Sequence, residues 1–289
     1  MTGTTWSLRA RGKSFSFEGP QVMGIINLTP DSFYDGGVVA TEDQIQGQID
    51  RMVSQGATFI DVGGESTRPG SDPVSQEEEF RRLGPFFSLL SAGSLPTEAI
   101  YSIDTTKLDV AQEALDAGCQ LVNCVSGRYD QDLLDIATDA NAAYVCMHAQ
   151  GSPKIMQDRP HYEDVVDEVE RFMDDFVEDA SQSSPNLGSI VIDPGFGFGK
   201  RLQDNLDLMN ALPQFVKHGH PVMVGVSRKS MIGSMLNGQP AEDRLNGSTV
   251  LHTVACMAGV HILRVHDVKE AVETVRIVSA LHQGGTPES

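Results

Sequence analysis

Long apolar runs are missing from this chain of 289 residues. No stretch reaches the ~18 apolar residues that a membrane-spanning helix needs, and the N-terminus lacks the apolar core of a signal peptide. The four cysteines form no CxxC pair and sit in apolar surroundings, so we expect buried thiols and neither disulfides nor a zinc site. These absences predict a cytoplasmic protein without a membrane segment.

Basic residues are scarce. Lys and Arg together number 21 against 40 Asp and Glu, which leaves a formal net charge of −19. Nucleic acids and anionic membranes would be repelled by this charge and are excluded as general partners. A small anion can still bind where basic side chains gather locally.

Several catalytic signatures are absent as well. The chain has no Walker spacing, no dinucleotide-binding fingerprint and no evident Ser-His-Asp arrangement. It also has no low-complexity segment or linker, and 40% hydrophobic residues suffice for one core. We therefore predict a single domain over residues 1–289, with a frayed tail at 284–289.

The chain repeats one pattern, in which an apolar run ends in a polar loop. Such runs cover residues 22–27, 99–103, 121–122, 142–147, 189–192, 221–226 and 260–263, and a further run ends at Asp61. Helical periodicity alternates with them at residues 42–55, 76–90, 108–117, 162–180, 202–218 and 269–282. About eight units favour an α/β fold of the closed (β/α)8 (TIM) barrel type over an open sheet, since that fold typically needs ~250 residues. Residues 1–20 predict a short N-terminal β-hairpin that closes the bottom of the barrel.

Active sites of this fold lie at the C-terminal ends of the strands, where the polar clusters of this chain fall. We call this end of the barrel the mouth. The basic residues Arg68, Arg228, Lys229 and Arg264 are expected there, together with Asp61, Asp104, Asn123, Asp193 and His266.

Asp104, Asn123 and Asp193 offer acceptors that would be costly to bury without partners. A flat heterocycle with adjacent N–H groups would satisfy them, and the 2-amino-4-oxo edge of a pterin or guanine matches the Asp193 carboxylate. Lys229 could donate to the carbonyl oxygen of the ring. The alternative for any single aspartate is a structural role, in which its carboxylate caps a loop or pairs with a neighbouring arginine.

A second set consists mostly of donors and suits a phosphate or pyrophosphate. It comprises Asn27, Thr67, Arg68, Arg264 and His266. The glycine-rich segment at 195–200 is a weak phosphate motif, and its Phe198 could instead form an apolar wall for a ring. His148 also ends a strand but has no obvious partner.

Two segments, MGIINLTPDSF at 23–33 and GGESTRPG at 63–70, resemble the two hallmark loops of the dihydropteroate synthase family. DPGFGFGK at 193–200, SRKS at 227–230 and RVHD at 264–267 resemble its later motifs, in the same order. The resemblance extends over residues 22–280. It implies a (β/α)8 barrel that joins 6-hydroxymethyl-7,8-dihydropterin pyrophosphate to 4-aminobenzoate and releases pyrophosphate and 7,8-dihydropteroate, the folate-pathway step that sulfonamides inhibit.

The resemblance also implies roles for individual residues. The pterin pocket would consist of Asp104, Asn123, Asp193 and Lys229; the pyrophosphate site of Asn27, Arg68, Arg264 and His266, with Mg²⁺ near Asn27; and the aminobenzoate pocket of Phe33, Thr67, Pro69, Phe198, Lys229 and Ser230. Asp35 belongs to the first hallmark loop and is counted among the substrate-binding residues. Asp104, Asp193, Lys229, Arg264 and His266 would act in catalysis, which the family implies to be a dissociative displacement.

A homodimer through the last helices is implied too. Val250, Leu251, Val254 and Met257 supply an apolar stripe there, which could equally be core. One departure from the family pattern is Cys124, which stands where an aspartate commonly follows the pterin-binding asparagine. Because adjacent strand residues face opposite ways, Cys124 should point toward the helices if Asn123 points to the ligand.

Two other functions remain open. A methyltetrahydrofolate-dependent methyltransferase has a related barrel but needs no pyrophosphate site. A non-catalytic pterin-binding barrel would be expected to lose residues such as Asn27, Asp35, Arg68 or His266 first, and all four are present.

Overall fold

Eight parallel strands alternate with helices in the computed structural model, which describes residues 5–29, 40–66, 71, 73–126, 130–151, 156 and 160–283. The strands are β3 (Gln21–Asn27), β4 (Phe59–Gly63), β5 (Ile100–Asp104), β6 (Leu121–Cys124), β7 (Ala143–Met147), β8 (Ile190–Asp193), β9 (Met223–Val224) and β10 (Ile262–Val265). The helices are α1 (Glu42–Ser54), α2 (Gln76–Ser91), α3 (Leu108–Ala117), α4 (Gln131–Asp139), α5 (Val165–Ser183), α6 (Leu202–Phe215), α7 (Ser230–Met235), α8 (Leu245–Ala258) and α9 (Val268–Gln283).

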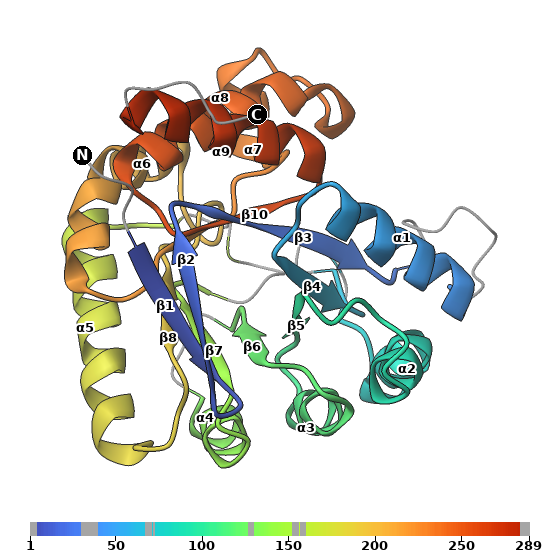
Figure 1. The fold of residues 1–289 in the computed structure, drawn as a ribbon. Coiled ribbons are helices and arrows are strands. Elements are labelled where there is room, and N and C mark those ends of the chain that lie inside the picture. The colour runs from blue at the N-terminus through green and yellow to red at the C-terminus, as the bar shows by residue number, and fades with distance from the viewer. Residues whose placement is uncertain are drawn as a thin grey trace.

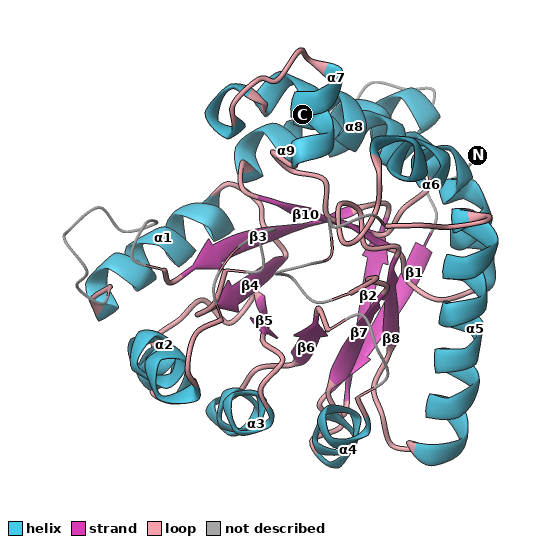
Figure 2. Ribbon diagram, turned by 180° about the vertical axis from the view of Figure 1, so that it is seen from behind, coloured by secondary structure: helices cyan, strands magenta, loops and turns pink. Residues whose placement is uncertain are grey.

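The sheet closes on itself. Its hydrogen-bonded order is β8-β7-β6-β5-β4-β3-β10-β9, and a parallel bridge between Ile192 and Val222 joins the two end strands β8 and β9. Figures 1 and 2 show the helices arranged around the outside of the strands. The predicted (β/α)8 barrel is therefore confirmed.

An antiparallel hairpin, β1 (Thr5–Ala10) and β2 (Lys13–Glu18), precedes the barrel. Its Leu8 and Ala10 belong to a buried cluster with residues near the starts of the barrel strands, such as Met23 and Phe59. Trp6, Phe15 and Phe17 pack against the same cluster. Since these residues lie at the N-terminal ends of the strands, the hairpin covers the bottom, as predicted.

Strand residues alternate between the barrel interior and the helix layer, as the period of two requires. Cys124 belongs to the core cluster that contains the helices, whereas its neighbour Asn123 hydrogen-bonds Asp61 on another strand. The prediction for Cys124 is thus confirmed. All four cysteines are free and buried, also as predicted.

The predicted elements differ from the observed ones mainly at their ends. The helix expected over residues 202–218 ends at Phe215 and continues as a 3-10 turn, Val216–His218. The run at 221–226 forms a strand only at Met223–Val224, and Pro221 at its start has no N–H to donate to a ladder. Among the described residues, no helix is long and apolar enough to cross a bilayer. The predicted tail at 284–289 lies outside the described residues.

Candidate active site

Four polar side chains from different strands are buried near the mouth of the barrel. They are Asp61 of β4 (0% exposed), Asp104 of β5 (4%), Asn123 of β6 (1%) and Asp193 of β8 (5%). Asp104 and Asn123 are direct neighbours in the parallel register. Acids buried this deeply need charge partners or a ligand that supplies donors.

Arg264 of β10 joins two of these acids across the barrel. Its Nε lies 2.7 Å from Asp61 Oδ2, and its Nη2 lies 2.6 Å from Asp104 Oδ2. Asn123 Nδ2 donates to the same Asp61 oxygen at 2.9 Å. The guanidinium group is therefore held in a fixed plane by two carboxylates.

One oxygen of each of these three side chains has no hydrogen-bond partner among the described residues. Asp61 Oδ1, Asp104 Oδ1 and Asn123 Oδ1 are buried without a hydrogen bond from any residue that the structure describes, and Ser102 Oγ on β5 is in the same state. Buried polar atoms are normally satisfied. These acceptors therefore suit a bound molecule that brings N–H donors into the barrel.

Burial and the neighbouring opposite charges shift the pKa values of Asp104 and Arg264 in opposite directions. Burial raises the pKa of Asp104 to about 7, while Arg264 works against that shift and Asp61 adds to it. Burial alone would lower the pKa of Arg264, but Asp61 and Asp104 outweigh burial and raise it. The arginine stays charged, and Asp104 can exchange a proton near neutral pH.

Asp193 and Lys229 form a second group at the mouth. Burial raises the pKa of Asp193, and Lys229 is the largest influence that lowers it. Burial lowers the pKa of Lys229 to about 8, while Asp193 opposes this shift. Lys229 Nζ donates to the carbonyl oxygen of Phe196 at 2.5 Å and lies 4.5 Å from the centre of the Phe198 ring. Lys229 therefore lies against the Phe198 ring and close enough to Asp193 for their charges to interact.

His266 and Arg228 follow the last two strands. His266 Nδ1 lies 3.1 Å from Ser227 Oγ, and its backbone N–H donates to the same oxygen at 3.2 Å. Arg228 Nε and Nη2 lie 2.8 and 2.6 Å from the two oxygens of Asp267. Arg228 was expected to add positive charge at the mouth, but Asp267 neutralises it.

Two of the other predicted site residues lie in the described part of the chain. Asn27 ends β3 opposite Gly63 and is partly buried, and Ser230 is the exposed first residue of α7. Phe33, Asp35, Thr67, Arg68 and Pro69 lie outside the described residues. Their assignments stay predictions.

Two further charged groups were not assigned a role from the sequence. Asp61 was expected at the mouth only, yet it contacts both Asn123 and Arg264. Lys107 Nζ contacts the carboxylates of Glu65, which lies within the second hallmark loop, and of Glu79 in α2. The position of Asp61 at the end of an apolar run indicated that it lies at the mouth with the other site residues. The spacing of Lys107 along the chain did not indicate its contacts with Glu65 and Glu79.

In the described part of the chain, no three His, Cys, Asp or Glu side chains lie close enough together to bind a metal ion. Mg²⁺ commonly uses only one or two protein oxygens and takes its remaining ligands from substrate phosphates and water. The amide oxygen of Asn27 at the end of β3 is compatible with that mode of binding.

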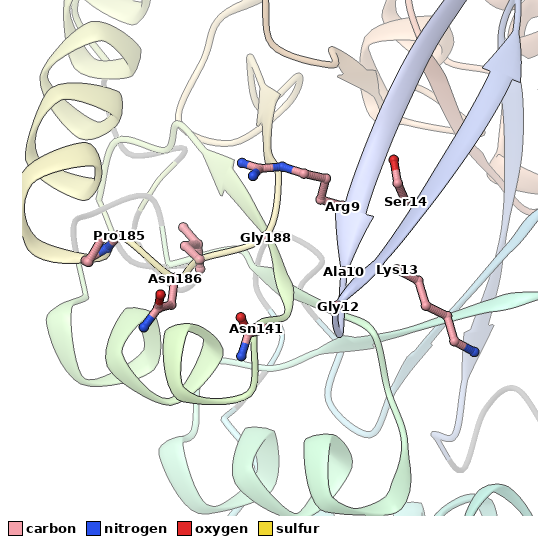
Figure 3. A pocket seen from close by; sticks show the side chains of 10 residues that line it. Arg9, Ala10, Gly12, Lys13, Ser14, Asn141, Pro185, Asn186 and Gly188 are labelled. Atoms are coloured by element: carbon pink, nitrogen blue, oxygen red, sulfur yellow. The ribbon is translucent and has the colours of Figure 1, made fainter.

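A pocket of about 300 Å³ lies at the other end of the barrel (Figure 3). Its lining includes Arg9 and Ser14 of the hairpin and Asn141 and Gly188, which precede β7 and β8. It contains none of the buried acids described above and is not the candidate site.

Comparisons with known proteins agree with this geometry. A family model described as "Pterin binding enzyme" matches residues 23–266. Dihydropteroate synthase of Escherichia coli K12 is 42% identical over 273 residues, which cover 94% of this chain and 95% of that protein. The structure of the Yersinia pestis dihydropteroate synthase with a sulfonamide drug complex has a TM-score of 0.86 and 40% identity, covering 96% of this chain and 100% of that one. The Xanthomonas albilineans dihydropteroate synthase with 4-aminobenzoic acid has a TM-score of 0.86 and 38% identity, covering 98% and 100%.

A closed parallel barrel with buried acids and an asparagine near its mouth, matched by this family model, defines a class: the pterin-binding barrel enzymes. Within this class, the chain belongs to the dihydropteroate synthase family. The resemblance read from the five motifs is confirmed.

Proposed function

We infer that this chain condenses 6-hydroxymethyl-7,8-dihydropterin pyrophosphate with 4-aminobenzoate to give 7,8-dihydropteroate and pyrophosphate, and so acts as a transferase of folate biosynthesis. The observation that carries the inference is 42% identity to a dihydropteroate synthase along 94% of the chain. The 4-aminobenzoic acid bound to the Xanthomonas enzyme and the sulfonamide complex of the Yersinia enzyme extend it to the second substrate and to sulfonamides as inhibitors.

The pterin ring is assigned to the buried acceptors. Asp193 would accept the two N–H groups of the 2-amino pyrimidine edge, and Asp104 and Asn123 would accept from the rest of the ring. The unpartnered Asp104 Oδ1 and Asn123 Oδ1 support this assignment, because a ring with N–H donors would satisfy them. Lys229 would turn from the Phe196 carbonyl oxygen toward the carbonyl of the ring.

The pyrophosphate group is assigned to Arg264, His266, Asn27 and the undescribed Arg68. Arg264 uses Nε and Nη2 for Asp61 and Asp104, which leaves Nη1 outside these two contacts. Asn27 would bind Mg²⁺ together with the substrate phosphates. This ion would neutralise part of the negative charge on the departing pyrophosphate.

The aminobenzoate is assigned to the outer part of the mouth. The Phe198 ring would form one wall, with Lys229 above it and Ser230 at the start of α7. Phe33, Thr67 and Pro69 complete this pocket as predictions from the family resemblance. The undescribed Asp35 stays a predicted substrate-binding residue of the first loop.

The protein's part in the reaction is positioning and electrostatics. Arg264 and His266 stabilise the charge that develops on the departing pyrophosphate. Asp193 and Asp104 favour the cationic dihydropterin ring left behind, and the aniline nitrogen attacks the exocyclic carbon without any protein nucleophile.

A homodimer is proposed through α8 and α9. Val250, Val254 and Met257 of α8 are 55, 41 and 64% exposed, and Ile277 and Leu281 of the adjacent α9 are 63 and 74% exposed. Leu251 is buried and belongs to the core. A shared apolar face of two helices is typical of an interface between subunits. The free thiols are consistent with the reducing cytoplasm that we propose as the location.

Pyrophosphate release tests the proposed function and separates it from its alternatives. Release should require the pterin pyrophosphate and 4-aminobenzoate together. A methyltransferase would give no pyrophosphate but would transfer the methyl group of methyltetrahydrofolate, and a binding protein would retain the pterin without turnover. Either of these results would overturn the assignment.

A further inference from the structure

The connection between β8 and α6, residues 194–201, packs directly on the segment that follows β7. Gly195 and Gly199 have φ angles of +70° and +63°. A Cβ at Gly195 would lie 1.8 Å from the carbonyl oxygen of His148, and a Cβ at Gly199 would lie 2.2 Å from that of Gln150. The two backbones therefore touch without room for a side chain.

Lys200 lies at this contact with only 3% of its surface exposed. Its Nζ donates to the carbonyl oxygens of Gly195 at 2.9 Å and Phe198 at 3.2 Å, and to that of His148 at 3.1 Å. Burial lowers the pKa of His148 to about 3, and its neutral Nδ1 lies 3.0 Å from the same Nζ, so the three N–H groups of Lys200 are shared among four acceptors. One ammonium group thus joins two connections that belong to different strands.

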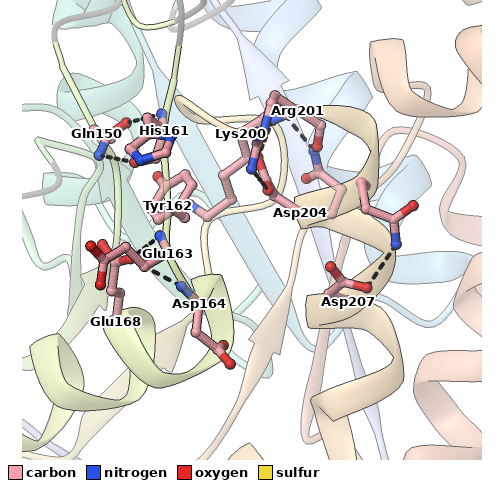
Figure 4. Close-up of polar contacts among 12 residues, drawn as sticks. Gln150, His161, Tyr162, Glu163, Asp164, Glu168, Lys200, Arg201, Asp204 and Asp207 are labelled. Atoms are coloured by element: carbon pink, nitrogen blue, oxygen red, sulfur yellow. Dashed lines mark hydrogen bonds and ion pairs between the residues drawn. The ribbon is translucent and has the colours of Figure 1, made fainter.

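The surroundings of Lys200 fix both sides of this junction (Figure 4). Tyr162 Oη donates to the carbonyl oxygen of Gly199 at 2.8 Å. The Gln150 side chain forms two hydrogen bonds of 3.1 Å with the backbone of His161, which ties together the two ends of the β7–α5 connection. Lys200, in the β8–α6 connection, therefore donates to His148 in the β7–α5 connection, and hydrogen bonds hold both of these segments in place.

Among the described residues, Lys200 has no carboxylate in direct contact. The four acceptors of Lys200 Nζ are all neutral, and Asp193 and Asp204 act on it only through space. Burial lowers the pKa of Lys200 to about 7, while Asp193 opposes this shift and Lys229 adds to it. A buried cation without a carboxylate in contact is costly, so its hydrogen bonds must offset that cost, and an apolar chain of similar length would leave the three carbonyl groups without this donor.

The opposite side of the same connection faces the substrate pocket. Gly195 N–H donates to Asp193 Oδ1 at 2.8 Å, so the backbone of Gly195 orients the carboxylate. Phe198 presents its ring to Lys229. Lys200 holds the carbonyl groups of both Gly195 and Phe198 from behind.

We propose that Lys200 is a positioning residue for the condensation: by fixing Gly195 and Phe198 from behind, it keeps the Asp193 carboxylate and the Phe198 ring in place for the two substrates. This inference rests on the proposed function. Phe198 lies within the connection, whereas Asp193 is anchored in β8, so loss of Lys200 should affect aminobenzoate more than the pterin.

Steady-state kinetics of the full-length enzyme test this role with Lys200→Met, Lys200→Arg and the control Arg201→Met. Arg201 is the next residue and is also cationic, but it pairs with Asp204 and contacts none of these carbonyl groups. For Lys200→Met we expect KM for 4-aminobenzoate to rise on the order of tenfold, with a smaller rise for the pterin pyrophosphate and a kcat within about threefold. Lys200→Arg keeps the donors and should recover part of the loss.

Three results would overturn the proposal. Lys200→Met could lose thermal stability with both KM values unchanged, it could change kcat and KM no more than Arg201→Met does, or Lys200→Arg could recover nothing. If Lys200→Met does not fold, Lys200→Gln takes its place, and an unchanged KM for 4-aminobenzoate there would count equally against the proposal. A wild-type enzyme that forms no dihydropteroate would instead refute the proposed function.

Discussion

Replacing Arg264 by methionine tests the charge arrangement at the centre of the site. The guanidinium group contacts Asp61 and Asp104, whose side chains are 0 and 3% exposed, and is itself 17% exposed. Methionine fills much of the same space but leaves both carboxylates without a cation. Among the described residues, Asp61 then keeps only the side-chain hydrogen bond from Asn123.

The expected loss follows from the burial of these groups. Removing one partner of a buried ion pair costs about 3–5 kcal/mol, because a charge remains buried and unpaired. Asp104 can reduce this cost by binding a proton. Its pKa is already raised to about 7 by burial, and losing Arg264 raises it further. Above pH 7 the folded variant therefore holds a proton on Asp104 that the unfolded chain lacks, so the contribution of Asp104 to its stability falls by about 1.4 kcal/mol per pH unit, whereas in the wild type this contribution stays level.

Urea unfolding followed by circular dichroism at pH 6 and pH 8.5 measures both effects. We expect a loss of about 3–5 kcal/mol at pH 8.5 and a loss smaller by about 2 kcal/mol at pH 6. Arg81→Met, which removes an ion pair with Glu78 on the helix surface, should change little at either pH. A loss for Arg264→Met that is equal at both pH values would refute the reasoning that Asp104 takes up the proton.

Three further predictions concern the pocket, the β8–α6 connection and the proposed dimer. Asp193→Asn should weaken calorimetric binding of the pterin pyrophosphate by about 1–3 kcal/mol, because its oxygen would accept from Gly195 N–H and its NH₂ would face the donors of the ring; unchanged affinity would remove Asp193 from the pocket. Gly195→Ala should prevent normal folding, whereas Gly219→Ala, with a φ of +84° but nothing within 4 Å of its Cβ, should cost only about 1 kcal/mol; similar thermal shifts for the two variants would contradict the packing described for Gly195. Met257→Asp should shift sedimentation from dimer to monomer while Leu108→Asp, on the distant α3, should not; a dimeric Met257→Asp would move the interface away from α8.

The barrel could be predicted because its signals are local. Each apolar run ends in a polar loop, and the ends at Asn27 and Asp193 coincide with the ends of β3 and β8. The opposite orientations of Asn123 and Cys124 also follow from the period of a strand alone. Parallel strands then bring all these ends to one side, which is why the sequence predicts that Asp61, Asp104, Asn123 and Asp193 lie near the mouth.

The pairing within the site could not be predicted, because it depends on how the barrel closes. Arg264 was assigned to pyrophosphate from its place after an apolar run, and nothing local shows that its planar group spans Asp61 and Asp104 on strands far away in the sequence. His148 had no visible partner, since Lys200 reaches it only across two connections. Contacts of this kind are set by strand register and loop packing, which residue spacing does not encode.

The most direct test of the assigned reaction is to identify and count both products in one incubation. With the pterin pyrophosphate and ring-deuterated 4-aminobenzoate, mass spectrometry should detect 7,8-dihydropteroate that carries the full label, and one pyrophosphate should appear for each molecule formed. Omitting either substrate should abolish both products. Pyrophosphate release without labelled dihydropteroate, or a retained pterin that never reacts, would contradict the account.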